Sequence, residues 1–439
     1  MYLSVFFLLY PDINFGRNNF FSSKPLSIWF SLIYVCLHLG KIKKIRVEEF
    51  CFGISLLGSI IMGLVFSSGE NGISRISNGY IGFGAVYFAI RIFTTTASRK
   101  KIYKLITTMF KSYLFIILFF GGLQFAYIYL GHLEIIGQFL KSVLYRGSDY
   151  FYNLGISGKI DFTFTEPSLA GLYFYCYFLP VCWLCKKYRL VEEKKLRTSL
   201  LIAFILNMFT ISTRWYLDSI VCAFIIWLTS SKHSRVHKKA IVKGLMLSTI
   251  LLLILAIVIK FVIPKEIING QIIRFTTLFT KSKISSVDSD QSFMVRLILL
   301  YVGIAAFFNN PLFGVGEGNF YLAMKKYMIT PSGWRARAEL TKIASDVSCS
   351  SYSFYTTSLG CGGLFGVIMI GSVIKTLFSS NAKEFKTLGL IIIYMFLQLE
   401  LFGTPLIAIW LAVINSGCFI AFENKKERTS YENFNYYAV

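Results

Sequence analysis

The fold is decided by residues 105–130, LITTMFKSYLFIILFFGGLQFAYIYL, an apolar run that directly follows the basic segment RKKIYK at residues 99–104. A straight α-helix needs about 20 apolar residues to cross a hydrocarbon core of roughly 30 Å, so such a run is typical of a membrane span. Similar runs recur along the 439 residues, of which 55% are hydrophobic and only 15% are charged. The sequence therefore predicts an all-α polytopic membrane protein without a separate soluble domain.

The basic residues lie mainly in short segments between the apolar runs. The formal net charge of +23 would by itself fit a protein that binds nucleic acid. Short loops rich in Lys and Arg stay on the cytoplasmic side of a membrane, beside anionic lipid, so the charge here sets the topology and argues against a nucleic-acid partner. The basic segments are residues 41–46, 99–104, 186–197, 232–243, 375–386 and 425–428.

Placing these basic segments in the cytoplasm predicts about twelve transmembrane helices, with both termini cytoplasmic. The first run lacks a basic start and a small-residue cleavage site, so we interpret it as a short span and not as a signal peptide. The predicted spans are residues 1–11, 25–40, 49–66, 77–95, 105–130, 166–185, 198–213, 214–231, 241–263, 351–374, 387–402 and 404–422.

Two long segments remain on the outer face, residues 131–165 and residues 264–350. The second carries ten Lys and Arg against six Asp and Glu, a net of +4. It is either an unconstrained long loop, to which the charge rule does not apply, or an anion-binding surface. Within it we expect an amphipathic helix in the membrane interface at residues 267–279 and an apolar, re-entrant or packed helix at residues 291–308.

The chain is thus organised as a series of membrane and outer regions. The regions are N-terminal transmembrane helices (1–130), an outer loop (131–165), central transmembrane helices (166–263), a large outer loop with helices (264–350), C-terminal transmembrane helices (351–422) and a cytoplasmic tail (423–439).

Three ionisable residues are candidates for chemistry. Glu166, in the sequence TEPS at 165–168, either opens a helix favourably or serves as a functional carboxylate at the membrane surface. Arg214, at the turn of a predicted helical hairpin, either snorkels, pairs with Asp218 one turn later or holds a phosphate. Arg296 has no carboxylate three or four residues after it to pair with, so it is the strongest candidate for binding phosphate.

No motif in the sequence predicts a metal or a cofactor. The glycine-rich residues 309–320, NNPLFGVGEGNF, lack the strand and helix that a nucleotide-binding loop connects. Asp288 and Asp290 are either a metal-binding pair or a helix cap. The nine cysteines lie almost entirely in apolar runs, and the pair Cys182 and Cys185 has no second pair to complete a metal site.

Taken in order, five motifs resemble those of the bacterial O-antigen polymerase (Wzy) and O-antigen ligase superfamily. The likeness covers roughly residues 160–375, and the order and spacing of the motifs carry it. The motifs are Glu166-Pro-Ser, Ser212-Thr-Arg, the helix that contains Arg296, the glycine-rich residues 309–320 and SYSFYTTSLGCGGLFG at residues 351–366.

The resemblance implies an integral-membrane glycosyltransferase with a GT-C-like fold in the bacterial inner membrane, with its active site facing the periplasm. It implies no metal, cofactor or nucleotide sugar. In the polymerase, a growing glycan leaves undecaprenyl pyrophosphate and is joined en bloc to a sugar hydroxyl of a fresh lipid-linked repeat unit. The implied partners are these lipid-linked oligosaccharides and membrane lipid, and a chain-length regulator is a candidate protein partner.

Such a reaction needs cations for the leaving diphosphate and a base for the attacking hydroxyl. The resemblance assigns the first task to Arg214 and Arg296, and Glu166 is the weaker candidate for the base or a sugar contact. The substrate-binding residues that the resemblance implies are Arg274, Gly314, Gly316, Asn319, Ser353 and Tyr355.

The start of the last motif distinguishes the members of the superfamily. Ligases carry a His-Asn pair there, whereas this chain has Tyr352 and Ser353. The difference favours a polymerase over a ligase and leaves the base unidentified. A rival function is a flippase or transporter of lipid-linked sugars, but such proteins are often built from repeated halves, and the two halves of this chain do not resemble each other.

Overall fold

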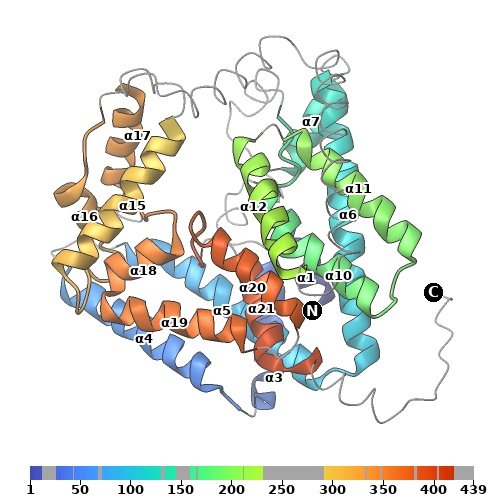
Figure 1. Ribbon diagram of the computed structural model, residues 1–439, viewed down its shortest axis with the longest axis horizontal. Helices are drawn as coiled ribbons and strands as arrows, with labels where there is room; N and C mark the ends of the chain where they lie inside the picture. Colours follow the sequence, from blue (N-terminus) through green and yellow to red (C-terminus); the bar gives the residue numbers. More distant parts are fainter. Residues whose placement is uncertain are drawn as a thin grey trace. The chain divides into compact units, whose positions relative to one another are not determined.

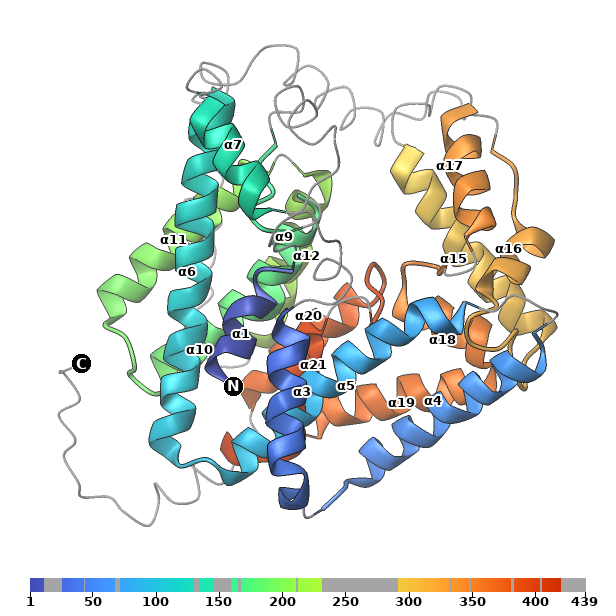
Figure 2. The same cartoon turned by 180° about the vertical axis from the view of Figure 1, so that it is seen from behind.

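The computed structural model shows a helical protein (Figures 1 and 2). Its regular elements in the described residues are helices, with no β-strand among them, so the all-α prediction is confirmed there. The chain forms two compact units: the first holds residues 28–102 and 280–439 together with Met1, and the second holds residues 2–27 and 103–279. The structure describes residues 1–11, 26–42, 44–67, 72–129, 134–144, 159–164, 167–210, 212–230, 291–331, 334–346, 349–379, 383–402 and 405–419.

The second unit contains most of α6 (Arg99–Tyr129), a helix of 31 residues that includes residues 105–129 of the apolar run quoted first. A stretch of π-helix interrupts the long helix that begins at Leu169. The other elements of this unit are α1 (Tyr2–Leu8), α7 (Glu134–Val143), α9 (Leu169–Tyr173), the π segment η2 (Phe174–Phe178), α10 (Leu179–Lys187), α11 (Glu193–Met208) and α12 (Thr213–Ser230).

The first unit brings helices from the N-terminal and C-terminal parts of the chain together. α4 packs along α19, α5 along α21, and α15 along α18. The elements of this unit are α3 (Leu26–His38), a 3-10 turn η1 (Leu39–Lys41), α4 (Val47–Val65), α5 (Ile73–Thr96), α15 (Gln291–Asn309), α16 (Phe320–Tyr327), α17 (Trp334–Ser345), α18 (Phe354–Gly362), α19 (Leu364–Phe378), α20 (Lys383–Met395) and α21 (Leu406–Ser416).

Membrane-spanning character is concentrated in a few of these helices. Within the described residues, three helical stretches are long and apolar enough to cross a membrane: α4, α6 and Leu169–Lys187. Shorter apolar helices, such as α19 and α21, occupy further predicted spans. The helix expected at residues 291–308 is confirmed as α15. The predicted span 241–263 and the predicted interface helix 267–279 lie outside the described residues.

The predicted span 351–374 is wrong as a single straight helix. It consists of α18 and α19, separated at Gly363, whose φ of +54° is incompatible with a continuing right-handed helix. A Cβ at Gly363 would lie 2.6 Å from the Gly314 nitrogen, so the break is where the glycine-rich loop approaches. The close contact, which a hydropathy pattern does not reveal, is the physical reason for the difference.

Two other predicted spans are shorter in the structure than in the prediction. The run 387–402 is helical only as far as Met395, and residues 396–402 form a loop. The run 1–11 contains the seven-residue helix α1, which is about 10 Å long at 1.5 Å per residue and cannot cross a core of about 30 Å by itself. The loop after α20 is important because it carries an acidic residue into the site described below.

Helices of the first unit approach closely where glycines lie at their contacts. A Cβ added to Gly303 of α15 would lie 2.6 Å from the Thr356 carbonyl oxygen of α18. One added to Gly63 of α4 would lie 2.0 Å from the Glu317 carbonyl oxygen. Small residues let backbones come this close in membrane proteins. These contacts are therefore made between backbones and leave no space for a larger side chain.

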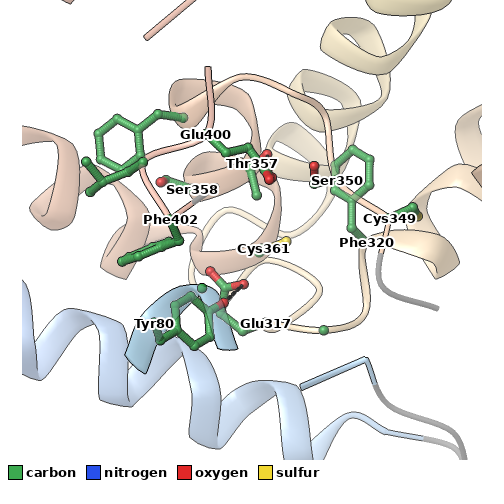
Figure 3. A pocket seen from close by; sticks show the side chains of 14 residues that line it. Tyr80, Glu317, Phe320, Cys349, Ser350, Thr357, Ser358, Cys361, Glu400 and Phe402 are labelled. Atoms are coloured by element: carbon green, nitrogen blue, oxygen red, sulfur yellow. Dashed lines mark hydrogen bonds between the residues drawn. The ribbon is translucent and has the colours of Figure 1, made fainter. Parts of the chain in front are cut away.

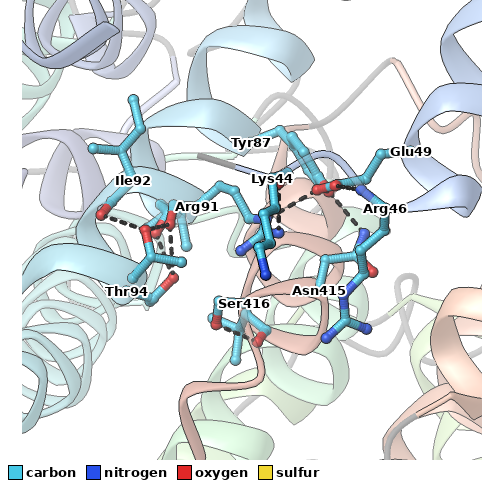
Figure 4. A network of polar contacts seen from close by, with 12 residues as sticks. Lys44, Arg46, Glu49, Tyr87, Arg91, Ile92, Thr94, Asn415 and Ser416 are labelled. Atoms are coloured by element: carbon cyan, nitrogen blue, oxygen red, sulfur yellow. Dashed lines mark hydrogen bonds and ion pairs between the residues drawn. The ribbon is translucent and has the colours of Figure 1, made fainter. Parts of the chain in front are cut away.

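A polar network joins α4, α5 and α21 at the end of α4 that lies opposite Gly63 (Figure 4). Glu49, near the start of α4, pairs with Arg91 of α5 at 2.9 Å and accepts a hydrogen bond from Tyr87. The Tyr87 hydroxyl accepts a hydrogen bond of 2.7 Å from the Asn415 amide of α21. Glu49 and Arg91 are both largely buried, so removing either one would leave its partner's charge without compensation.

Basic residues also lie at this end of the first unit, near the start of α4. Glu48 pairs at 3.1 Å with Lys375 near the end of α19. The start of α4 therefore meets the ends of α5, α19 and α21. Lys41–Arg46 immediately precede α4, and Arg99 follows the end of α5 within a few residues. The described basic residues that adjoin these helix ends thus gather at one end of the first unit.

Replacing Gly63 by Ala is expected to lower the free energy of unfolding by about 1–3 kcal/mol, because over-packing displaces the neighbouring backbone. Gly53 on the same helix has no atom within 4 Å of an added Cβ, so Gly53→Ala is the control. It should raise stability by up to about 1 kcal/mol through helix propensity. Thermal unfolding of the purified protein in detergent measures both, and equal stability of the two variants would contradict the tight contact.

Candidate functional site

The glycine-rich loop between α15 and α16 is clamped to two helices. The Gly316 amide donates to the Cys361 carbonyl oxygen of α18 at 2.8 Å, and the Glu317 amide donates to the Ser59 carbonyl oxygen of α4 at 3.0 Å. Gly316 has a φ of +82°, and a Cβ there would lie 2.4 Å from the Cα of Gly63. Glycine is required here by both backbone conformation and space.

Three predicted substrate contacts belong to this clamp. The Gly314 amide donates to the Asn310 carbonyl oxygen at 2.8 Å, and the Gly316 amide is engaged as described above. The buried Asn319 side chain donates from Nδ2 to the carbonyl oxygens of Gly63 at 2.8 Å and Val315 at 3.1 Å. In the structure, hydrogen bonds of Gly314, Gly316 and Asn319 hold the loop in its conformation. Their predicted contact with substrate stays a prediction.

The clamp places Glu317 in the wall of a cavity of about 170 Å³ (Figure 3). Glu317 is only 4% exposed, and Oη of Tyr80 on α5 donates a hydrogen bond of 2.8 Å to its Oε2. Phe320, Cys361 and other side chains from α18 and from the loop after α20 complete the lining. Segments distant in the sequence therefore meet around one buried carboxylate.

A second carboxylate, Glu400, enters the same cavity from the loop after α20 (Figure 3). Thr357 of α18 donates from Oγ1 to Oε1 of Glu400 at 3.4 Å, and the Ser350 side chain also forms a hydrogen bond to it. The loop is fastened to α18, because the Phe354 amide donates to the Phe396 carbonyl oxygen at 3.1 Å. The cavity thus contains a pair of acidic side chains on opposing segments.

Burial raises the pKa of Glu317 from its ordinary 4.5 to about 7. The hydrogen bond from Tyr80 acts in the opposite direction by stabilising the carboxylate, while negative charge on Glu400 raises the pKa further. A carboxyl group with a pKa near neutrality can both accept and release a proton under physiological conditions. It is therefore suited to general acid and base catalysis or to proton binding.

Two predicted substrate-binding residues of the last motif, Ser353 and Tyr355, support the wall of the cavity through hydrogen bonds outside it. The Ser353 hydroxyl donates to the Phe396 carbonyl oxygen at 3.0 Å, and the Tyr355 hydroxyl donates to the Ile393 carbonyl oxygen at 2.9 Å. Neither residue lines the cavity, although Phe354 between them does. Both bonds hold the start of α18 against α20 and the loop that follows it.

Arg296 lies on α15 in the same unit as the cavity. It is partly buried, and no carboxylate in the described part of the chain forms an ion pair with it. Neighbouring residues of α15 share a hydrophobic core with Phe320 and Cys361, which both line the cavity. A cation therefore lies on a helix that packs directly against the site.

Arg214 belongs to the second unit. Its Nε lies 3.5 Å from Oδ2 of Asp218, one turn later on α12, and both side chains are buried. The predicted alternative of a pair with Asp218 is thereby confirmed. The neighbouring Trp215 is fully buried and stacks on Tyr175 of the π segment. The predicted role of Arg214 in binding diphosphate stays a prediction.

Other predicted site residues lie outside the described residues. These include Glu166, Arg274 and the acidic pair Asp288 and Asp290. Among the described residues there is no group of three or more His, Cys, Asp or Glu side chains that could hold a metal ion. Cys182 and Cys185 are both buried free thiols.

Glu317, Glu400 and Tyr80 are the site residues that the sequence interpretation missed. Glu317 stands inside the glycine-rich motif that the resemblance used, but the interpretation chose the glycines and asparagine around it. Glu400 lies at the end of a predicted apolar span, and an ionisable residue in such a position is itself a signal of function. The pairing of the two carboxylates, in contrast, depends on the packing of α5, α18 and the two loops.

No protein-family model, curated protein or solved structure matches this chain.

The raised pKa of Glu317 predicts a pH-dependent stability. A carboxyl group whose pKa rises on folding binds a proton on folding, so its stabilising contribution is full below pH 4.5 and is lost as the pH rises through about 7. Glu317→Gln should flatten this part of the stability profile, whereas the exposed Glu339→Gln on α17 should retain it. Thermal unfolding between pH 4.5 and 8 measures the slope. Identical slopes in wild type and Glu317→Gln would contradict the assigned pKa.

Proposed function

We propose that the chain is a membrane glycosyltransferase of the O-antigen polymerase type, which joins undecaprenyl-pyrophosphate-linked oligosaccharide repeat units en bloc. The observation that carries the proposal is a pair of carboxyl groups, the buried Glu317 and the partly buried Glu400, that line one cavity. Two suitably placed carboxyl groups are the usual means of glycosyl transfer in hydrolases that act on sugars. Glu317 lies in the glycine-rich motif that resembles the polymerases, whereas Glu400 lies beyond the region of resemblance. Glu317 is the proposed base that the sequence left unidentified.

In the proposed reaction, Glu317 accepts the proton of the attacking sugar hydroxyl as that oxygen bonds to the anomeric carbon of the donor. The bond between the anomeric carbon and the diphosphate oxygen breaks, and the diphosphate leaves with its electron pair. A pKa of about 7 suits Glu317 for this transfer near neutral pH. Arg296 is the proposed cation for the leaving group, because a guanidinium matches phosphate oxygens.

The charge distribution supports a periplasmic active site. Glu49 and Gly63 mark the two ends of α4, about 20 Å apart at 1.5 Å per residue. Basic segments adjoin the Glu49 end, and Gly63 contacts the loop that carries Glu317. Because short basic segments stay in the cytoplasm, the proposed orientation turns the cavity toward the periplasm. The twelve spans and the inner-membrane location are part of this proposal.

A flippase or transporter of lipid-linked oligosaccharides is the second candidate function. The same carboxylate pair favours it, since buried acidic side chains in membrane proteins often bind the protons that drive transport. A polymerase null retains a single repeat unit on the lipid A core, whereas a flippase null or a ligase null loses even that unit. Lipopolysaccharide from a null strain therefore distinguishes the polymerase from the flippase and the ligase.

Glu317→Gln is expected to abolish long-chain O antigen, because the amide cannot accept the proton of the acceptor hydroxyl. Glu339→Gln, an exposed change on α17, should leave the ladder of chain lengths intact. Silver-stained gels of lipopolysaccharide from a complemented null strain, with immunoblots for membrane protein, show both. A full ladder from Glu317→Gln would overturn its role as the base.

Arg296→Ala is expected to remove the same long chains while leaving one repeat unit on the core. The long chains are lost because the variant lacks the positive charge beside the leaving diphosphate. Loss of one such preorganised group lowers the reaction rate by roughly a hundredfold or more. The exposed Arg337→Ala on α17 is the matched control. Full ladders from Arg296→Ala at normal protein levels would exclude it from the reaction.

A further inference from the structure

The cavity has an acidic and apolar lining. Glu317 and Glu400 are its charged side chains, and none of the described residues that line it is Lys or Arg. A diphosphate placed there would meet two carboxyl groups and no compensating cation, which is unfavourable in a site of low dielectric constant. The cavity therefore disfavours an anion and suits a ligand that donates hydrogen bonds to the two carboxyl groups.

An unused hydroxyl group also faces this cavity. Ser358 of α18 is 3% exposed and lines the cavity, where Figure 3 shows it on the same wall as Thr357. Its hydroxyl forms no hydrogen bond with any described residue, whereas the hydroxyls of Ser351 and Thr357 are engaged with each other at 2.7 Å. The Ser358 hydroxyl is therefore available to form a hydrogen bond with a polar ligand in the cavity.

Aromatic rings supply the apolar part of the lining. Phe402 packs against Tyr80 in an edge-to-face arrangement with ring centroids 4.6 Å apart, and Phe320 lines another part of the cavity. An aromatic face carries partial negative charge, which attracts the weakly positive C–H groups of a sugar ring. Carboxylates and hydroxyls beside such rings can bind the hydroxyl groups of the same sugar.

We infer that this cavity is a subsite for a single uncharged sugar ring, the one that presents the attacking hydroxyl to Glu317. Its volume of about 170 Å³ is below the roughly 300–1,000 Å³ of pockets that hold drug-sized ligands, so it accommodates one ring and not a repeat unit. The role of the bound sugar as acceptor rests on the proposed function. The binding of an uncharged sugar in the cavity is independent of that function and can be measured separately.

The subsite separates the acceptor from the charged end of the donor. Gly303 of α15 contacts Thr356 on α18, beside the cavity wall. Arg296 lies two turns before Gly303, about 10 Å away along the helix. The cavity with its two carboxyl groups and the candidate cation Arg296 thus lie beside different turns of α15. A donor would extend from the cavity toward Arg296, with its diphosphate kept away from the carboxylates.

The test is equilibrium binding to the purified full-length protein in detergent. Calorimetry would use a panel of uncharged hexoses, 6-deoxyhexoses and N-acetylhexosamines, and inorganic pyrophosphate as a separate probe. Ser358→Ala should weaken the sugar that binds best by about three- to tenfold, as expected for one lost hydrogen bond, and leave pyrophosphate unaffected. Arg296→Ala should weaken the binding of pyrophosphate and leave the affinity for the sugar unchanged. Ser358→Thr, which adds a methyl group toward the cavity, should also weaken the sugar.

The outcomes separate the inference from the proposed function. Failure of every panel sugar to bind wild type, unchanged sugar affinity in both folded Ser358 variants, or displacement of sugar by pyrophosphate would overturn the subsite. Displacement by Na⁺ alone would assign the cavity to a cation instead. Sugar binding together with a normal lipopolysaccharide ladder from Glu317→Gln would retain the subsite and reject Glu317 as the base, and a full ladder from the null strain itself would reject the polymerase. Thermal unfolding of each variant verifies that it is folded.

Discussion

The first unit depends on the contact between the backbone of the glycine-rich loop and the backbone of α4. A loop can exist among apolar helices only if its amides find acceptors, since lipid offers none. The Ser59 carbonyl oxygen of α4 provides one acceptor and the Cys361 carbonyl oxygen of α18 provides another. The absence of a side chain at Gly63 permits this approach. The same hydrogen bonds fix the direction of Glu317, so packing and site geometry have one physical origin.

Helix positions were largely accessible from the sequence, because apolar runs and basic segments carry that information locally. α4, α5, α6 and α15 occur where the pattern placed them. The pattern failed where a tertiary contact interrupts an apolar run. Gly363 breaks one run to admit the loop, and residues 396–402 leave the helical path after Met395. Hydropathy records the affinity of a segment for lipid and is insensitive to such breaks.

The candidate site was predictable only in part. The motif at residues 309–320 indicated the correct loop, and the resemblance made Gly314 and Gly316 substrate contacts. In the structure their amides form hydrogen bonds to backbone carbonyl oxygens. Glu317 and Glu400 are separated by more than eighty residues, and no periodic pattern relates them. Their meeting follows from the attachment of both loops to α18, through the Gly316–Cys361 and Phe354–Phe396 backbone hydrogen bonds. Arg296 could be chosen from sequence alone because an arginine without a nearby carboxylate is conspicuous in an apolar helix.

The glycine-mediated packing also bears on how such a protein can diversify. Residues that hold the cavity in place act through backbone atoms, so most substitutions at Gly63 or Gly316 disturb the whole unit. Residues that face the cavity, such as Phe402 and Ser358, present part of their side chains to its free space. Mutation can therefore alter ligand preference at the second group without loss of folding. Evolutionary variation among descendants of this chain would accumulate on the cavity lining while its scaffold stays constant.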